Sequence, residues 1–147
     1  MTKKRISQKL RRLVKERALG YCEYCICPDS HATQEHSLEH IIPEVQDGRS
    51  TGDNLALSCQ GCNNIKYNKT HTHDPVSQEI VSFFHPRHDN WHEHFTWGAD
   101  RLTLVGLTPI GRATIEALRL NRKGVINLRR LLLLDGKHPP AHRSSSE

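Results

Sequence analysis

The amino-acid sequence predicts a small α+β protein, and three observations lead to that prediction. Apolar residues at helical spacing come first, the middle of the chain has the order strand, loop, strand, helix, and a strand and two helices follow. The 147 residues fit one domain with an appended lobe. Only 35% of them are hydrophobic and 5% aromatic, and the mean hydropathy is −0.65. A core this thin generally needs a metal or a partner chain for stability.

Residues 2–19 are expected to form a basic helix. One face carries apolar side chains at helical spacing: Ile6, Leu10, Leu13, Val14 and Ala18. Gly20 follows as a stop signal. Lys and Arg occupy the other faces, among them Arg11, Arg12 and Lys15. These charges indicate either an ordinary solvated face or a face that contacts nucleic-acid phosphates.

The middle of the chain, residues 21–68, holds two expected strands and the start of a helix. We predict a strand over 37–43, where Ile41 and Ile42 are β-branched, and a second strand over 55–58. The residues between them, 45–53, contain Gly48 and Gly52 and are expected to form a loop. A helix is expected to open within 63–69.

The C-terminal half is expected to begin irregularly, because residues 71–94 are rich in His, Pro and Asp. A strand is predicted over 102–107, and Thr108-Pro109 is a typical helix start for a helix to about residue 122. A second helix is expected over 125–134, and the tail 136–147 is expected to be disordered. The predicted organisation is therefore a domain of residues 1–70, an extension of residues 71–135 that packs on it, and the tail.

Four of the five cysteines form two CxxC pairs, Cys22 with Cys25 and Cys59 with Cys62. Each pair brings two thiolates onto one tight turn, and two such turns supply the four soft ligands that suit tetrahedral Zn²⁺. Since four cysteines leave no open coordination position, this zinc is expected to be structural. Buried free thiols or disulfides are the alternative. Cys27 is left over as a spare thiol or a substitute ligand, and its separation from Cys25 by one residue makes it the worse choice of ligand.

Charge and hydropathy indicate a cytoplasmic protein with a polyanionic partner. The net charge is +5 and the pI is about 9.1, a balance that favours nucleic acid. The longest apolar run, residues 131–134, is far shorter than the roughly 20 residues of a membrane-spanning helix. The basic N-terminus has no apolar segment after it, so we predict neither a secretory signal nor a membrane partner.

Three short stretches between and around the cysteine pairs carry the candidate chemistry. They are EHIIP at 39–43, DNLALSC at 53–59 and CQGCNNIK at 59–66. In these stretches residues 12–69 resemble the HNH endonuclease family, in its zinc-bearing branch. The resemblance implies a ββα-metal nuclease core stapled by the four cysteines. Residues 85–134 also resemble the C-terminal extension of some small bacterial members, a likeness that assigns no roles.

The resemblance implies a role for each of four residues. His40 matches the general base that activates the attacking water, and Glu39 matches an acidic metal ligand that is usually Asp. Asn54 matches the asparagine that braces the loop and orients His40. Asn63 stands where a second metal ligand is often His, which makes the chain an HNN variant. Glu39 and Asn63 would then hold one catalytic Mg²⁺ or Mn²⁺.

General chemistry is consistent with these roles, although each residue has a simpler interpretation. Histidine, with an ordinary pKa near 6.5, suits a base at neutral pH, and carboxylate and amide oxygens suit Mg²⁺ or Mn²⁺. Glu39 and His40, as neighbours on a strand, point to opposite sides unless the strand end bends. Taken singly, His40 is a strand histidine, Asn54 a turn residue and Asn63 a helix cap.

Other polar residues remain candidates with open alternatives. Lys66 is expected either to contact a phosphate or to be an exposed helix lysine. For the histidines of residues 71–94 three roles are open: they could form a second metal site, line a nucleic-acid surface, or pack against the core. Trp91, Phe95 and Trp97 are the expected apolar anchor of the C-terminal lobe.

Two functions from different classes follow. The first is a metal-dependent endonuclease that hydrolyses phosphodiester bonds in double- or single-stranded DNA, with His40 as general base and one divalent cation. The alternative is a non-catalytic, zinc-stabilised module that binds nucleic acid. A regulatory or adaptor protein would need no basic face and explains less of the sequence.

Overall fold

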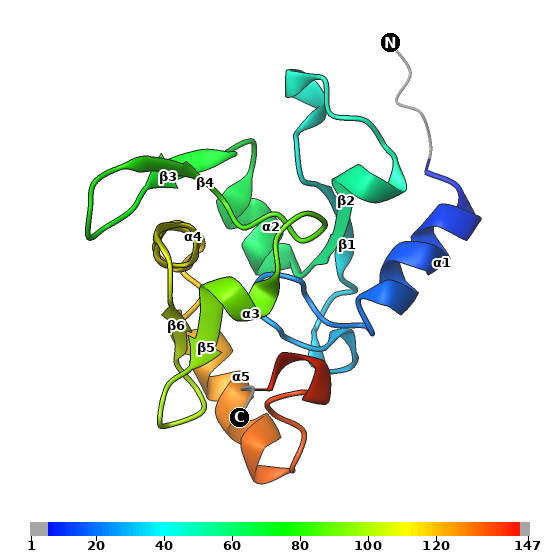
Figure 1. The fold of residues 1–147 in the computed structure, drawn as a ribbon. Helices are drawn as coiled ribbons and strands as arrows, with labels where there is room; N and C mark the ends of the chain where they lie inside the picture. The colour runs from blue at the N-terminus through cyan, green and yellow to red at the C-terminus, as the bar shows by residue number, and fades with distance from the viewer. Residues whose placement is uncertain (1–5, 145–147) are drawn as a thin grey trace. The chain divides into compact units, whose positions relative to one another are not determined.

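The computed structural model describes residues 6–144 and divides into two compact units, which meet in the chain between Thr70 and His71 (Figure 1). The first unit combines helices with one two-stranded antiparallel sheet. The second combines helices with two such sheets. The α+β fold class predicted from the sequence is confirmed. No helix within residues 6–144 has the length and apolar character needed to cross a membrane.

The first unit opens with α1, Gln8–Arg17. Ser7 caps it, since its Oγ accepts a hydrogen bond of 3.2 Å from the backbone N–H of Leu10. The helix ends before Leu19 and Gly20, which both have positive φ. Val14 is fully buried and packs in a cluster with Ala18, Leu55 and Leu57. The predicted helix over 2–19 is therefore present from Gln8, and its residues 2–5 lie outside the described residues.

A β-hairpin followed by a helix forms the rest of the first unit. β1, Ser37–His40, pairs antiparallel with β2, Leu55–Ser58, and His40 lies opposite Leu55. α2, Gln60–Lys66, follows directly. The predicted second strand is confirmed, whereas the first ends at His40, three residues earlier than expected. α2 begins three residues earlier than expected, because the side chain of Cys59 caps it.

The loop between the two strands turns sharply after Ile42. Pro43 lacks the N–H that a strand ladder requires, and a short 3-10 helix, Glu44–Gln46, begins after it. Gly48 then passes so close to the chain that a Cβ at this position would lie 1.7 Å from the carbonyl oxygen of Ile42. Glycine is therefore required here by space, and the loop folds back tightly on the end of β1.

The second unit contains two hairpins and three helices. β3, His71–His73, pairs with β4, Ile80–Ser82, and β5, Phe95–Trp97, pairs with β6, Leu104–Gly106. The helices are α3, Trp91–His94, α4, Pro109–Leu118, and α5, Lys123–Leu134. Thr108 caps α4 with Pro109 at its first position, as predicted. The prediction of irregular structure over 71–94 holds for the turns and loops of this segment, but it missed β3, β4 and α3.

An acidic side chain explains why that polar segment is ordered. Asp74 accepts hydrogen bonds in the β3–β4 turn from the backbone N–H of Val76 and of Ser77. Arg112 of α4 donates to both carboxylate oxygens of Asp74, at 3.0 and 2.8 Å. Short-range composition suggested a loop, but this bidentate pair ties the hairpin to a helix.

Trp91, Phe95 and Trp97 are buried and form the apolar centre of the second unit, as predicted. The indole N–H of Trp97 donates to the carbonyl oxygen of Arg143 at 2.6 Å. That contact belongs to the tail, which the sequence composition indicated to be disordered. Residues 136–144 instead follow a defined path that includes a 3-10 helix, Ala141–Arg143, because a buried indole N–H needs an acceptor. Residues 145–147 lie outside the described residues.

Candidate metal centre and active site

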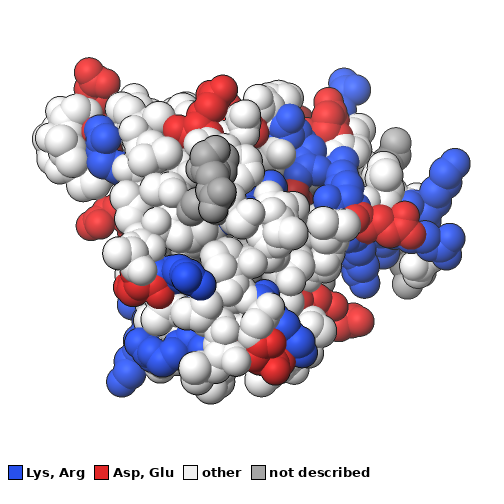
Figure 2. Space-filling model, turned by 60° about the horizontal axis from the view of Figure 1, so that its bottom comes forward, with Lys and Arg blue, Asp and Glu red and all other residues white. Residues whose placement is uncertain are grey.

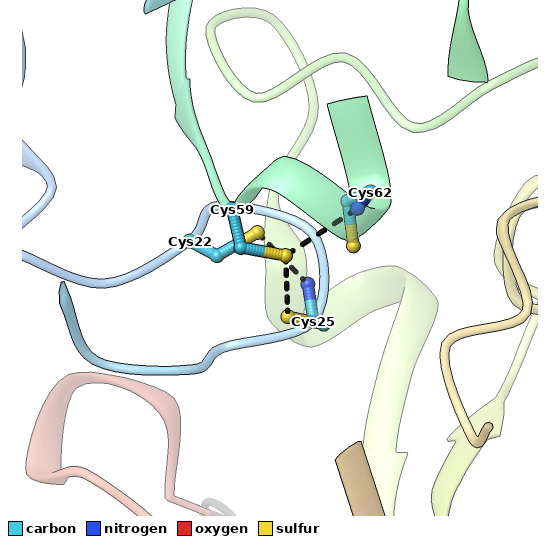
Figure 3. Close-up of side chains that lie close together, drawn as sticks. All are labelled: Cys22, Cys25, Cys59 and Cys62. Carbon is cyan, nitrogen blue, oxygen red and sulfur yellow. Dashed lines mark hydrogen bonds between the residues drawn. The ribbon is translucent and has the colours of Figure 1, made fainter. Parts of the chain in front are cut away.

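Four cysteine sulfurs gather at one point of the first unit (Figure 3). The Sγ atoms of Cys22, Cys25, Cys59 and Cys62 all lie within 4.8 Å of one another, and those of Cys25 and Cys59 are 3.6 Å apart. Zn–S bonds of about 2.3 Å in a tetrahedron place sulfurs roughly 3.8 Å apart. The cluster therefore has the donor set and the spacing to hold zinc. Cys27 lies outside it, as expected.

Local backbone geometry shapes each half of this cluster. In the first CxxC turn the N–H of Cys25 points to the Sγ of Cys22 at 3.4 Å, and Ile26 takes a positive φ that closes the turn. In the second, Cys59 is the N-cap of α2 and its Sγ accepts from the N–H of Cys62, also at 3.4 Å. The cluster thus joins the turn after α1 to the start of α2.

Buried polar side chains hold the first cysteine turn in place. The carboxylate of Glu23 accepts a hydrogen bond of 2.8 Å from the N–H of Leu57 in β2. The ring Nε2 of His36 lies 2.9 Å from the carbonyl oxygen of Cys27. Neither contact was predicted from the sequence, because both join segments that carry no shared pattern.

Burial also explains why this cluster calls for a cation. Desolvation raises the pKa of the Cys22 thiol well above its ordinary value, because a buried thiolate loses its hydration. A metal ion in the cluster reverses that preference by binding the thiolate. Within residues 6–144, the four cysteines are the one group of three or more His, Cys, Asp or Glu side chains gathered this closely. The histidines of residues 71–94 form no comparable group.

A pocket of about 390 Å³ opens beside β1, the loop that follows it, and α2. Three of the four residues with implied catalytic roles line it, namely Glu39, His40 and Asn63. Its other polar lining comes from Glu44, Asn64, Tyr67 and Asn68. The fold thus brings the expected residues of strand and helix to a common pocket.

His40 is the last residue of β1, and its side chain is 18% exposed. Its Nε2 lies 2.8 Å from the Oγ of Ser50 and 3.4 Å from a carboxylate oxygen of Glu44. The imidazole is therefore held by the loop on one side and open to the pocket on the other. Sequence reasoning did not single out Ser50 or Glu44, since both lie in the loop.

Asn54 does not line the pocket but ties the loop together from behind. Its Oδ1 accepts from the N–H of Ile42 at 2.9 Å, and its Nδ2 donates to the carbonyl oxygens of Ile42 and Arg49 at 3.0 and 2.9 Å. These three bonds join the backbone on both sides of the loop that carries Ser50. Asn54 thereby fixes the loop against which His40 rests.

Glu39 is almost fully buried at the edge of the pocket, and its carboxylate contacts two protein side chains. Its Oε2 accepts a hydrogen bond of 2.7 Å from the hydroxyl of Tyr24, and its Oε1 lies 2.5 Å from the Nζ of Lys66. Lys66 is itself 1% exposed, and its Nζ also donates to the carbonyl oxygen of Ile41 at 3.0 Å. Burial raises the pKa of Glu39, and the neighbouring Lys66 ammonium opposes that rise.

This geometry corrects the expectation for Lys66. A buried ammonium paired with Glu39 is available neither as an exposed helix lysine nor as a phosphate contact. The physical reason is helical spacing, since Lys66 follows Cys62 by one turn and shares its inward face. That spacing was the signal in the sequence that could have placed Lys66 in the interior.

The same geometry bears on the catalytic cation that the family resemblance implies. Mg²⁺ and Mn²⁺ bind through carboxylate oxygens and retain several waters. Oε2 of Glu39 accepts from Tyr24 and Oε1 is paired with the Lys66 ammonium, so a divalent ion would compete with a buried cation for this carboxylate. Asn63 lines the pocket as expected. Of the two expected ligands, Asn63 therefore faces the pocket freely, whereas Glu39 is paired with Lys66.

The basic side chains expected to face nucleic acid lie on α1. Arg12 and Lys15 are exposed, and Arg11 is half-buried. Figure 2 shows Lys and Arg side chains gathered on the side where Figure 1 places α1, with acidic side chains among them. The helix thus presents a surface that is mainly basic and contains some acidic side chains.

The strands β1 and β2 and the helix α2 form a ββα module. The four-cysteine cluster joins it to the turn after α1, and His40 ends its first strand. Residues 22–69 match the model of the HNH endonuclease family. This part of the chain, less than half of its 147 residues, is therefore an HNH domain. The match contains both cysteine pairs and Glu39, His40, Asn54 and Asn63. No match was found among curated proteins or solved structures.

Proposed function

We propose that this protein is an endonuclease that hydrolyses phosphodiester bonds in DNA, with His40 as the general base. The observation that carries the proposal is the position of His40, which is held at Nε2 and lines an open pocket within an HNH domain. In the tautomer whose Nε2 donates to Ser50, the other ring nitrogen keeps a lone pair. That nitrogen takes a proton from the water that attacks phosphorus.

Neighbouring groups support the chemistry of this base. Glu44 places a carboxylate oxygen 3.4 Å from Nε2, on the side of the ring opposite the nitrogen that would accept the proton. Ser50 and the loop braced by Asn54 keep the ring in one orientation. The amides of Asn63 and Asn64 line the same pocket and offer N–H donors to phosphate oxygens. The base is therefore positioned before the substrate arrives.

Double- or single-stranded DNA is the proposed substrate because the chain combines an HNH domain with a net charge of +5 and a basic α1. Arg11, Arg12 and Lys15 would contact phosphates away from the scissile bond. We also propose that the four cysteines hold a structural zinc ion. A reducing compartment such as the cytoplasm keeps such thiols available for metal.

The family resemblance further implies one Mg²⁺ or Mn²⁺ in catalysis. Because Glu39 is held by Lys66 and Tyr24, we assign it no ligand role. Any requirement for a divalent cation is measured directly in the experiment below.

The alternative function is a zinc-stabilised module that binds nucleic acid without cutting it. The Glu39–Lys66 pair favours this alternative, since it occupies a carboxylate that a metal-dependent nuclease would use. Both functions predict zinc binding and salt-sensitive binding to DNA. They differ in whether His40 is needed for a chemical step.

The deciding experiment incubates the zinc-loaded full chain with supercoiled plasmid and with single-stranded DNA, in Mg²⁺, Mn²⁺ and EDTA. We expect cleavage that His40→Ala reduces by about 100-fold or more, the usual contribution of a general base. His73→Ala, an exposed histidine in β3, is the matched control and should cut normally. DNA binding without cleavage under every condition, or full activity of His40→Ala, would rule out the proposal.

A further inference from the structure

A lysine ammonium lies inside the first unit, between strand β1 and helix α2. Lys66 is 1% exposed, and its Nζ contacts Oε1 of Glu39 at 2.5 Å and the carbonyl oxygen of Ile41 at 3.0 Å. Tyr24 donates to the other oxygen of Glu39 at 2.7 Å. A buried charge of this kind is rare and is stable only when paired.

We propose that Lys66 is the cation of Glu39 in this protein, and that Glu39 therefore binds no divalent metal ion. The carboxylate has two oxygens: Oε2 accepts a hydrogen bond from the Tyr24 hydroxyl, and Oε1 forms an ion pair with the buried Lys66 ammonium. Glu39 is 4% exposed, so a hydrated Mg²⁺ or Mn²⁺ in the pocket would meet little of its carboxylate. Metal binding would have to expel a buried ammonium, which would lose its partner.

The ammonium also joins the two elements that a bridging metal would join. It extends from the last residue of α2 to Glu39 and Ile41, the residues on either side of His40 in the chain. Lys66 thus holds the backbone of His40 against the helix without an exchangeable ion. This inference concerns metal binding alone, and it holds whether or not the protein cleaves DNA.

The test measures Mn²⁺ binding to the zinc-loaded full chain by electron paramagnetic resonance of the free ion. We expect the natural protein to have no site tighter than the millimolar range. Lys66→Ala, which removes the ammonium and leaves space beside the carboxylate, should bind Mn²⁺ at least about tenfold tighter. Adding Glu39→Gln to that variant should abolish the gain. Lys69→Ala, an exposed lysine just beyond the same helix, is the matched control and should behave as the natural protein.

A micromolar Mn²⁺ site in the natural protein that Glu39→Gln removes would overturn the proposal, as would a folded Lys66→Ala that gains no site. If Lys66→Ala does not fold, the double variant Glu39→Gln/Lys66→Met decides, because it replaces the ion pair by a neutral pair. Equal, weak Mn²⁺ binding by the natural protein and this double variant supports the proposal. Weaker binding by the double variant contradicts it.

Discussion

At the scale of single residues, the candidate site depends on side chains that act in pairs. His40 is held by Ser50, and Glu39 is neutralised by Lys66. Each pair joins a strand residue to a residue of the loop or of α2. Asn54 is different, since it uses one amide to satisfy three backbone groups. The arrangement is therefore sensitive to single substitutions that remove one partner and leave the other buried.

Asn54→Ala is expected to destabilise the protein by roughly 3 kcal/mol, because three part-buried hydrogen bonds to backbone groups of Ile42 and Arg49 are lost. Urea unfolding of the zinc-loaded protein, followed by circular dichroism, measures this loss. Asn64→Ala, an exposed asparagine, serves as the control for stability and should change little. A stability for Asn54→Ala equal to that of the natural protein would show that the amide does not brace the loop.

At the scale of elements, the order strand, loop, strand, helix was predictable because each element has a local signal. The exact start and end of each element were less predictable. β1 ends at His40 rather than residue 43, since Pro43 and the tight approach of Gly48 end the ladder. α2 begins at Gln60 because a cysteine, not a conventional capping residue, accepts from the first turn. Helix α1 was predicted from its periodicity and presents its charges to solvent.

Removing two of those charges with Arg12→Ala/Lys15→Ala is expected to weaken DNA binding. The slope of the logarithm of the binding constant against the logarithm of the salt concentration should also become shallower by about 2, one for each lost phosphate contact. Titration of labelled duplex at several salt concentrations measures both quantities. Lys123→Ala/Arg130→Ala, two exposed basic residues of α5, removes the same charge elsewhere. An equal effect of the two double variants would show that binding follows net charge and not α1.

At the scale of the whole molecule, stability is expected to depend on the cysteine cluster because the chain is poor in hydrophobic residues. The core of the first unit centres on four buried residues, Val14, Ala18, Leu55 and Leu57, with a few partly buried neighbours. A structural zinc ion contributes folding free energy directly, since the unfolded chain lacks the preformed site.

Chelation of the metal, or Cys22→Ser, is therefore expected to lower helix content and melting temperature, whereas Cys27→Ser should keep one zinc per chain. Acidification should have the same effect as chelation. Because burial raises the pKa of the Cys22 thiol, protons compete with the metal, and zinc affinity falls as the pH is lowered. Metal content and circular dichroism across pH measure this. Unchanged melting after zinc removal would show that the cluster is not structural.

The sequence by itself determined the features that depend on short segments. The spacing of two CxxC pairs predicted the four-cysteine cluster, periodicity predicted α1, and Thr108-Pro109 predicted the start of α4. The stretches around His40 predicted an HNH domain. Tertiary structure alone decided which groups meet across segments. Lys66 pairs with Glu39, Ser50 meets His40, and Arg112 holds Asp74, because burial and packing bring together charges and hydroxyls whose types carry no sign of their partners.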